Sequence, residues 1–165
     1  MDDLKHSPLE SAHVELGARM VPFAKWNMPI QYEGILAEHK AVRDSVGVFD
    51  ISHMGQLSVK GHAAAKWLDS TLTNHVGKLE IGQGQYTLLL NERGGVIDDL
   101  IVYRTGSEEF FLVVNASKTD EDHETLYDRL DIDAGIDLEN RSADFAGIAV
   151  QGPCLLYTSD AADEV

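Results

Sequence analysis

The chain is poor in cysteine, in basic residues and in long apolar segments, and each shortage narrows what it can be. A single cysteine, Cys154, excludes an internal disulfide and a zinc site made of several cysteines. Lys and Arg number 13 against 28 Asp and Glu, and the net charge of −15 would repel nucleic-acid phosphates and anionic lipid. No apolar run approaches the roughly 20 residues of a bilayer-spanning helix, and the N-terminus lacks the pattern of a secretory signal. We therefore expect a cytoplasmic protein without nucleic-acid or membrane partners.

The composition that is present is that of an ordinary globular domain. The 165 residues are 44% hydrophobic and 25% charged, which suits about one domain with a real core. Apolar patterns and turn residues predict strands at 85–90, 96–104, 110–115 and 145–150, with one bent strand or two short ones over 48–60. Helices are expected at 33–46, 62–72 and from a cap at Ser117 to about Leu130; 20–32 reads as irregular or short strand, and 131–144 as an acidic loop. Strands in adjacent hairpins between helices indicate an α+β fold, mainly an antiparallel sheet with flanking helices.

Two adjacent carboxylates stand inside an apolar strand pattern in the segment Asn91–Arg104. Aspartate is depleted in strands, and a buried carboxylate needs partners. Alternation puts Asp99 on one face with Tyr103, and Asp98 on the other. If Tyr103 pairs with Phe111 of the next strand, Asp99 lies opposite Asn115, so that a carboxylate and an amide converge. The alternative is that both acids only mark a sheet edge or a bulge.

Other candidate motifs give weaker evidence for a functional site. Asp50 and His53 are three residues apart, but no further ligands at metal-binding spacing accompany them, so we expect packed, hydrogen-bonded residues and no metal site. The glycines at 82–84 and 94–95 lack the strand-then-helix setting of a phosphate loop. No Ser/His/Asp or Cys/His nucleophile set is visible.

Five short segments, taken together, resemble one known family. They are Phe-Ala-Lys-Trp-Asn-Met-Pro-Ile-Gln-Tyr (23–32), Phe-Asp-Ile-Ser-His-Met (49–54), Asn-Glu-Arg-Gly-Gly-Val-Ile-Asp-Asp-Leu-Ile-Val-Tyr (91–103), Val-Val-Asn-Ala (113–116) and Val-Gln-Gly-Pro (150–153). Their order is similar to that in the N-terminal part of the T-protein of the glycine cleavage system, a folate-dependent aminomethyltransferase. The resemblance covers roughly residues 8–153 and less than half of a full-length member.

The resemblance implies a function and a site. The family moves an aminomethyl group from the lipoyl arm of the H-protein to tetrahydrofolate, giving 5,10-methylenetetrahydrofolate, ammonia and the dihydrolipoyl arm. The family's key aspartate corresponds to Asp99, which would orient the folate and assist proton removal, while Asp98 would take an outward or structural position. The pterin-pocket residues correspond to Met54, Tyr86, Tyr103, Val113 and Asn115.

The sequence also departs from the family. Lys25 stands where the family usually has glycine, which we interpret as a surface change. The family places a further acid and an arginine for folate in its second half, and residues 154–165 do not resemble its continuation. We therefore expect residues 1–153 to be an incomplete folate-binding region with an atypical tail, inactive alone.

Three alternatives remain from the sequence. One is the folate-dependent demethylating module of sarcosine- or dimethylglycine-oxidising enzymes, which usually follows a flavin domain. Another is a non-catalytic folate-binding protein of iron–sulfur maturation, which would carry its own cysteine motif. The third is an α+β domain whose acids are purely structural.

Overall fold

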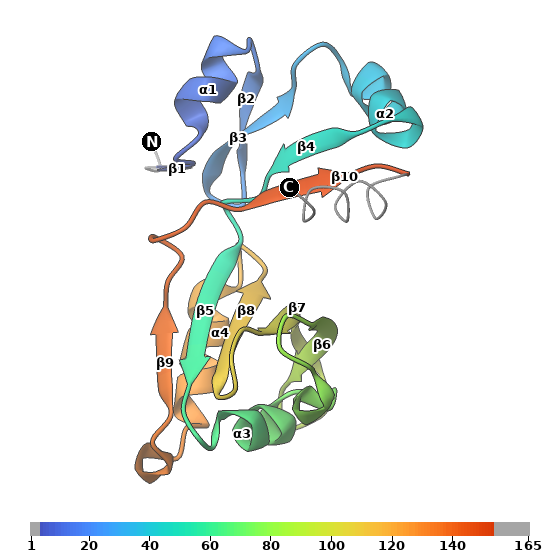
Figure 1. The fold of residues 1–165 in the computed structure, drawn as a ribbon. Helices are drawn as coiled ribbons and strands as arrows, with labels where there is room; N and C mark the ends of the chain where they lie inside the picture. The colour runs from blue at the N-terminus through green and yellow to red at the C-terminus, as the bar shows by residue number, and fades with distance from the viewer. Residues whose placement is uncertain (1–3, 154–165) are drawn as a thin grey trace. The chain divides into compact units, whose positions relative to one another are not determined.

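The computed structural model describes residues 4–153, which fall into two compact units (Figure 1). The terminal unit consists of residues 4–53 together with 146–153, and the central unit is Met54–Phe145. The α+β class with mainly antiparallel pairing is confirmed. The predicted atypical tail lies outside the described residues. Within the described part of the chain, no helix combines the length and apolar character needed to cross a bilayer.

The terminal unit contains a three-stranded sheet and a separate two-stranded pair. Its elements are β1 (Lys5–His6), α1 (Glu10–Glu15), β2 (Arg19–Phe23), β3 (Trp26–Gln31), α2 (Ile35–Asp44), β4 (Gly47–Asp50) and β10 (Ile148–Gln151). The sheet has the order β1-β3-β2, with β1 parallel to β3 and β2 antiparallel to it. β4 pairs antiparallel with β10 from the other end of the chain.

The β2–β3 hairpin turns sharply at two non-glycine residues. Ala24 and Lys25 have φ angles of 47° and 67°, in the left-handed region that ordinary residues avoid. Two-residue hairpin turns need such angles because their twist matches that of the strands. The family's usual glycine at position 25 thus has a backbone reason, and the interpretation of Lys25 as only a surface change is incomplete.

Replacing Lys25 with glycine should stabilise the terminal unit by roughly 0.5–1 kcal/mol, because glycine adopts positive φ without strain, though it also loosens the unfolded chain. Trp26 lies in the terminal unit and Trp67 in the central unit, and these are the two tryptophans of the sequence. Labelling with fluorotryptophan and following each ¹⁹F resonance through a urea titration separates the two unfolding transitions. Lys25→Ala is the matched control; a gain as large as that of Lys25→Gly would contradict the strain argument.

A buried hydrogen-bond network centred on Asp50 joins the parts of the terminal unit. The Asp50 carboxylate is 1% exposed and accepts hydrogen bonds from the Ser7 hydroxyl and, at 2.8 Å each, from His13 Nε2 and the Ser52 backbone N–H. The Tyr32 hydroxyl lies 2.8 Å from His13 Nδ1 and donates to it when Nε2 carries the proton. Burial alone would raise the pKa of Asp50, but these hydrogen bonds lower it to about 2.

The sequence predicts that Asp50 and His53 are packed, hydrogen-bonded residues. Asp50 is hydrogen-bonded, to His13 far away in the chain, whereas His53 Nδ1 is buried without a hydrogen-bond partner among the described residues. The His53 ring instead meets Phe23 edge-on, with ring centroids 5.6 Å apart. Among residues 4–153, no group of three or more His, Cys, Asp or Glu side chains is arranged to hold a metal ion.

Asp50→Ala should lower the unfolding free energy of the terminal unit by about 3 kcal/mol, since it leaves buried donors without an acceptor. Because folding lowers the Asp50 pKa from 3.8 to about 2, this stabilisation is complete above pH 3.8 and is lost as the pH falls toward 2. The ¹⁹F resonance of Trp26 reports the loss. Asp44→Ala, which removes an exposed ion pair with Lys40, is the control and should lower the free energy of unfolding by less than about 1 kcal/mol. Equal losses of unfolding free energy in both variants would contradict a stabilising role for the network.

The central unit is built on a five-stranded antiparallel sheet of order β6-β7-β8-β5-β9. Its elements are β5 (Gly55–Lys60), α3 (Ala64–Thr71), the 3₁₀ turn η1 (Val76–Lys78), β6 (Gly84–Leu90), β7 (Val96–Arg104), β8 (Glu109–Val114), α4 (Thr119–Asp128), the 3₁₀ turn η2 (Ile132–Ala134) and β9 (Asp137–Asn140). The segment 48–60, predicted as one bent strand or two short ones, forms two strands, β4 and β5, in two different units.

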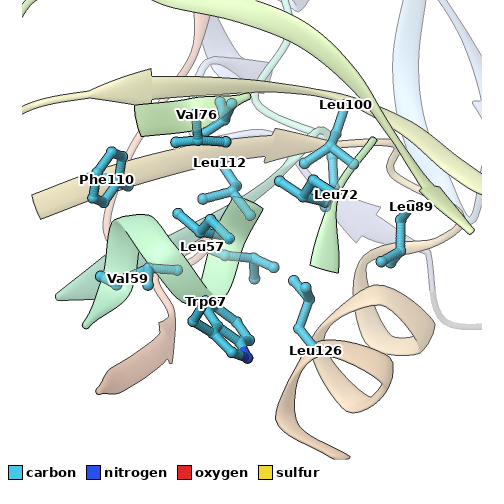
Figure 2. Close-up of a cluster of buried hydrophobic side chains, with 14 of the residues drawn as sticks. Leu57, Val59, Trp67, Leu72, Val76, Leu89, Leu100, Phe110, Leu112 and Leu126 are labelled. Carbon is cyan, nitrogen blue, oxygen red and sulfur yellow. The ribbon is translucent and has the colours of Figure 1, made fainter. Parts of the chain in front are cut away.

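One hydrophobic core serves the central unit (Figure 2). Alternate residues of the strands meet Trp67 and Leu68 of α3 and Leu126 of α4, so both helices lie against the same side of the sheet. The fully enclosed side chains include Leu57, Val59, Leu68, Leu89, Val102, Phe110, Leu112, Val114 and Leu126. In the described part of the terminal unit, by contrast, Met28 is the one buried hydrophobic side chain.

Several predicted boundaries change in the structure. Ser117 does not cap the last helix: Lys118 is the N-cap residue, without a side-chain capping bond, and the Thr119 hydroxyl donates back to the Asn115 carbonyl at 3.2 Å. The segment 131–144, predicted as a loop, contains β9, whose sequence Asp-Leu-Glu-Asn lacks the β-branched and aromatic residues typical of strands. β9 is an edge strand, where charged side chains discourage further pairing.

Candidate functional site

The segment Asn91–Gly95 forms the tight turn between β6 and β7. The Asn91 side-chain oxygen accepts the backbone N–H groups of Arg93 and Gly95 at 3.0 and 2.9 Å, and Gly94 takes the positive φ of 78° that closes the turn. An irregularity between Leu89 and Leu90 shifts the register next to this turn. The turn thus fixes which residues of β6 and β7 lie opposite each other.

The register of β7 on β8 is the predicted one. Tyr103 lies opposite Phe111, and Ile101 lies opposite Val113. Farther along, the Asn115 side-chain N–H₂ donates to the Asp99 backbone carbonyl at 3.0 Å and to Asp99 Oδ1 at 3.2 Å. The convergence of a carboxylate and an amide, expected from the sequence, is therefore confirmed.

The two adjacent carboxylates point to opposite sides of the sheet. Asp98 is 5% exposed and lies on the core side with Leu100 and Val102. Asp99 is exposed on the other side. The predicted outward position for Asp98 is wrong, because Leu100 and Val102 fix the parity of the strand and carry Asp98 inward with them. The other predicted possibility, a structural position for Asp98, agrees with this burial.

Asp99 is held by two side chains and still has free acceptor positions. The Tyr86 hydroxyl donates to Asp99 Oδ2, and Asn115 donates to Oδ1. An ionised carboxylate offers about four acceptor positions, so roughly half remain for a ligand. The hydrogen bond to Asp99, with smaller contributions from burial and from the charges of both carboxylates, raises the pKa of the exposed Tyr86 phenol.

The other predicted site residues lie on this same face of the sheet. Val113, Ile101 and Tyr86 form a row across β8, β7 and β6. Tyr103 lies over Gly84, where an added Cβ would stand 2.5 Å from its ring, so only glycine leaves room for the aromatic side chain. Met54 precedes Gly55, which pairs with Val114, and continuing this register brings Met54 opposite Asn115.

All six predicted site residues therefore come from neighbouring strands or strand ends of one sheet face. Their roles in binding and catalysis stay a prediction. Sequence reasoning missed the fully buried Asp122 of α4, whose spacing of four residues from Leu126 was the available signal. Because Asp120 and Glu121 stand in the same first turn of α4, the sequence did not distinguish Asp122 from an ordinary exposed acid.

Asp99→Asn should lower the pKa of Tyr86 toward that of an ordinary phenol, because the amide no longer offers a charged acceptor that opposes phenol ionisation. The Cζ resonance of ¹³C-labelled tyrosine, followed through an alkaline titration, measures the change. An unchanged Tyr86 pKa would show that the hydrogen bond to Asp99 does not exist in solution.

Comparison with known proteins gives a consistent result. The family model described as the GCVT N-terminal domain matches residues 9–155. The aminomethyltransferase of Chloroherpeton thalassium is 50% identical over 150 residues, and that of Deinococcus deserti is 49% identical over 150 residues. These matches cover 91% of this chain but only 41% and 42% of the relatives, so the chain spans about two fifths of their length.

A solved structure supports the same assignment. The crystal structure of the glycine cleavage system aminomethyltransferase T from Bartonella henselae matches with a TM-score of 0.81 and 38% sequence identity, over 91% of this chain and 41% of that one. Fold and sequence thus agree over nearly the whole chain. The chain belongs to the GCVT N-terminal domain family.

Proposed function

We propose that this chain provides the carboxylate-bearing part of a tetrahydrofolate-dependent aminomethyltransferase, with Asp99 as its catalytic residue. The observation that carries the proposal is the exposed Asp99 carboxylate, which Tyr86 and Asn115 hold on one face of the central sheet. The relatives named aminomethyltransferase favour this reading over the demethylating and iron–sulfur alternatives.

The chemistry of the sheet face fits a reduced pterin. Tyr86 and Tyr103 are 57% and 39% exposed, and with Val113 they offer aromatic and apolar surface to a flat ring. Met54 adds an adaptable apolar side chain just before the start of β5. Asp99, with acceptor positions still free, offers a partner to the N–H groups along the polar edge of the ring.

The proposed reaction needs a proton acceptor and no oxidant. The methylene carbon leaves the lipoyl sulfur and its own amine, and it forms bonds to N5 and N10 of tetrahydrofolate. Each folate nitrogen gives up one proton, and these two protons complete the dihydrolipoyl thiol and ammonia. Asp99 would accept a proton from the attacking nitrogen, and its negative charge would stabilise the cationic methylene intermediate as ammonia departs.

The proposed partner is the lipoylated H-protein that delivers the aminomethyl group. An arm-borne substrate requires an accessible reacting group, and the side chain of Asp99 lies on the solvent-exposed face of the sheet. Positioning of the folate by this face would then bring the two reactants together, and such positioning accounts for a large part of catalysis in two-substrate reactions.

The sharpest test uses a chimaera in which residues 1–153 replace the corresponding part of the Chloroherpeton thalassium enzyme, since this chain spans 41% of that relative. The chimaera should form 5,10-methylenetetrahydrofolate from tetrahydrofolate and aminomethylated H-protein. Asp99→Asn keeps the shape but removes the base, and it should reduce kcat by about 10²-fold or more.

Asp128→Asn is the matched control, because Asp128 is an exposed acid at the end of α4, away from the Asp99 face. It should leave the rate unchanged. Equal rates for the unsubstituted chimaera and its Asp99→Asn variant would overturn the catalytic role. A folded chimaera that releases no methylenetetrahydrofolate would overturn the proposed activity.

A further inference from the structure

Helix α4 carries an acid into the core side of the central unit. Asp122 and Leu126 are four residues apart and therefore lie on the same face of the helix. Leu126 belongs to the hydrophobic core, and Asp122 is 0% exposed. The start of α4 approaches β5 so closely that a Cβ at Gly55 would collide with Thr119, which anchors the first turn of the helix against the sheet.

Asp122 meets a second buried acid there, Asp98 of β7. Both oxygens of Asp122 are buried, and none of the ordinary donors of the described residues reaches them. Two carboxyl groups in contact cannot both ionise in such a place, so one keeps its proton and donates a hydrogen bond to the other. Burial first, then the hydrogen bond and charge of Asp98, raises the pKa of Asp122 to about 8.

Asp98, in turn, accepts two hydrogen bonds from Asn115. The Asn115 backbone N–H donates to Asp98 Oδ2 at 3.0 Å, and its side-chain N–H₂ donates to Asp98 Oδ1 at 2.9 Å. The second proton of the same N–H₂ group faces Asp99 O and Oδ1, at 3.0 and 3.2 Å. The Asn115 amide thus connects the buried carboxylate on one side of the sheet with the exposed carboxylate on the other.

We propose that Asp122 is a positioning residue: as a neutral carboxylic acid it donates a hydrogen bond to Asp98, which fixes the Asn115 amide that orients Asp99. A neutral donor at position 122 is needed because a second negative charge would push Asp98 away from Asn115. The consequence for catalysis rests on the proposed function, whereas the hydrogen-bond chain itself does not.

The chain of contacts makes the site sensitive to alkaline pH. The charged groups that act on Asp122 are Asp98 from β7 and Glu121 from α4, which favour its neutral form, and Lys118 at the start of α4, which opposes them. Folding raises the Asp122 pKa from 3.8 to about 8, so the folded chain keeps a proton that the unfolded chain loses. The free energy of unfolding should consequently fall as the pH rises between these two values.

The experiment follows the Asn115 side-chain N–H₂ resonances by NMR in the complete 165-residue chain, without folate. In the unsubstituted protein they should shift with a midpoint near pH 8, as Asp122 ionises. Asp122→Asn retains a donor of the same shape, so it should keep the separated N–H₂ resonances and remove the transition. Asp122→Leu should collapse them to the positions of a free amide.

Asp120→Asn is the control, because Asp120 is an exposed acid in the same first turn of α4 and should leave the transition in place. A folded chain without a transition near pH 8, or an Asp122→Asn variant that retains it, overturns the proposal. Should Asp122→Leu fail to fold, the Asp122→Asn comparison alone decides.

A second readout uses the chimaera described above. Its kcat should decline above about pH 8, and this decline should be absent in the Asp122→Asn variant. A decline of the same midpoint in both proteins would contradict the positioning role. Failure of the proposed enzyme activity would remove this second readout but would not alter the NMR result, so the two hypotheses fail separately.

Discussion

The pairing of β7 with β8 is the constraint on which the candidate site depends. Because side chains alternate along a strand, setting Tyr103 opposite Phe111 decides that Asp98 enters the core side and Asp99 faces out. A slip of one residue would exchange the two acids and bury Tyr103 in place of Val102. The hydrophobic residues of β7 therefore do more than stabilise the sheet, since they also select which carboxylate can meet a ligand.

The carboxyl groups on the two sides of the sheet differ in burial and in hydrogen-bond partners. Asp99 is exposed and accepts hydrogen bonds from the Tyr86 hydroxyl and the Asn115 amide, with further acceptor positions left free. Asp98 and Asp122 are both buried on the other side of the sheet, and Asp98 accepts hydrogen bonds from the backbone and side-chain N–H groups of Asn115. Asn115 is the link, because its single N–H₂ group contacts a carboxylate on each side.

The sequence predicted the parts of the structure that local pattern controls. The alternation of β7, the hairpin at Asn91–Gly95 and the convergence of Asp99 with Asn115 follow from side-chain period and turn chemistry. The inward position of Asp98 was missed because parity alone does not say which face the helices cover. Asp122 was missed because its partner lies on another element, and β9 because pairing with β5 overrides its weak strand preference. The hairpin within residues 20–32 depends on positive φ angles at Ala24 and Lys25, and neither alanine nor lysine favours such angles, so the sequence did not predict the turn.

The pairing of β4 with β10 has a consequence for how the chain folds. Asp50 lies opposite Ile148, so the whole central unit is inserted between two strands that hydrogen-bond to each other. Closing a flexible loop of that length costs about 4 kcal/mol of chain entropy. That is a heavy cost for a unit whose described part buries one hydrophobic side chain, Met28. The central unit has its own core and mostly pairs strands that are neighbours in the chain, so it can form first. Once it is folded, pairing β4 with β10 no longer loses the entropy of a long flexible loop. We therefore expect the insertion to act as the folding nucleus for the segments that flank it.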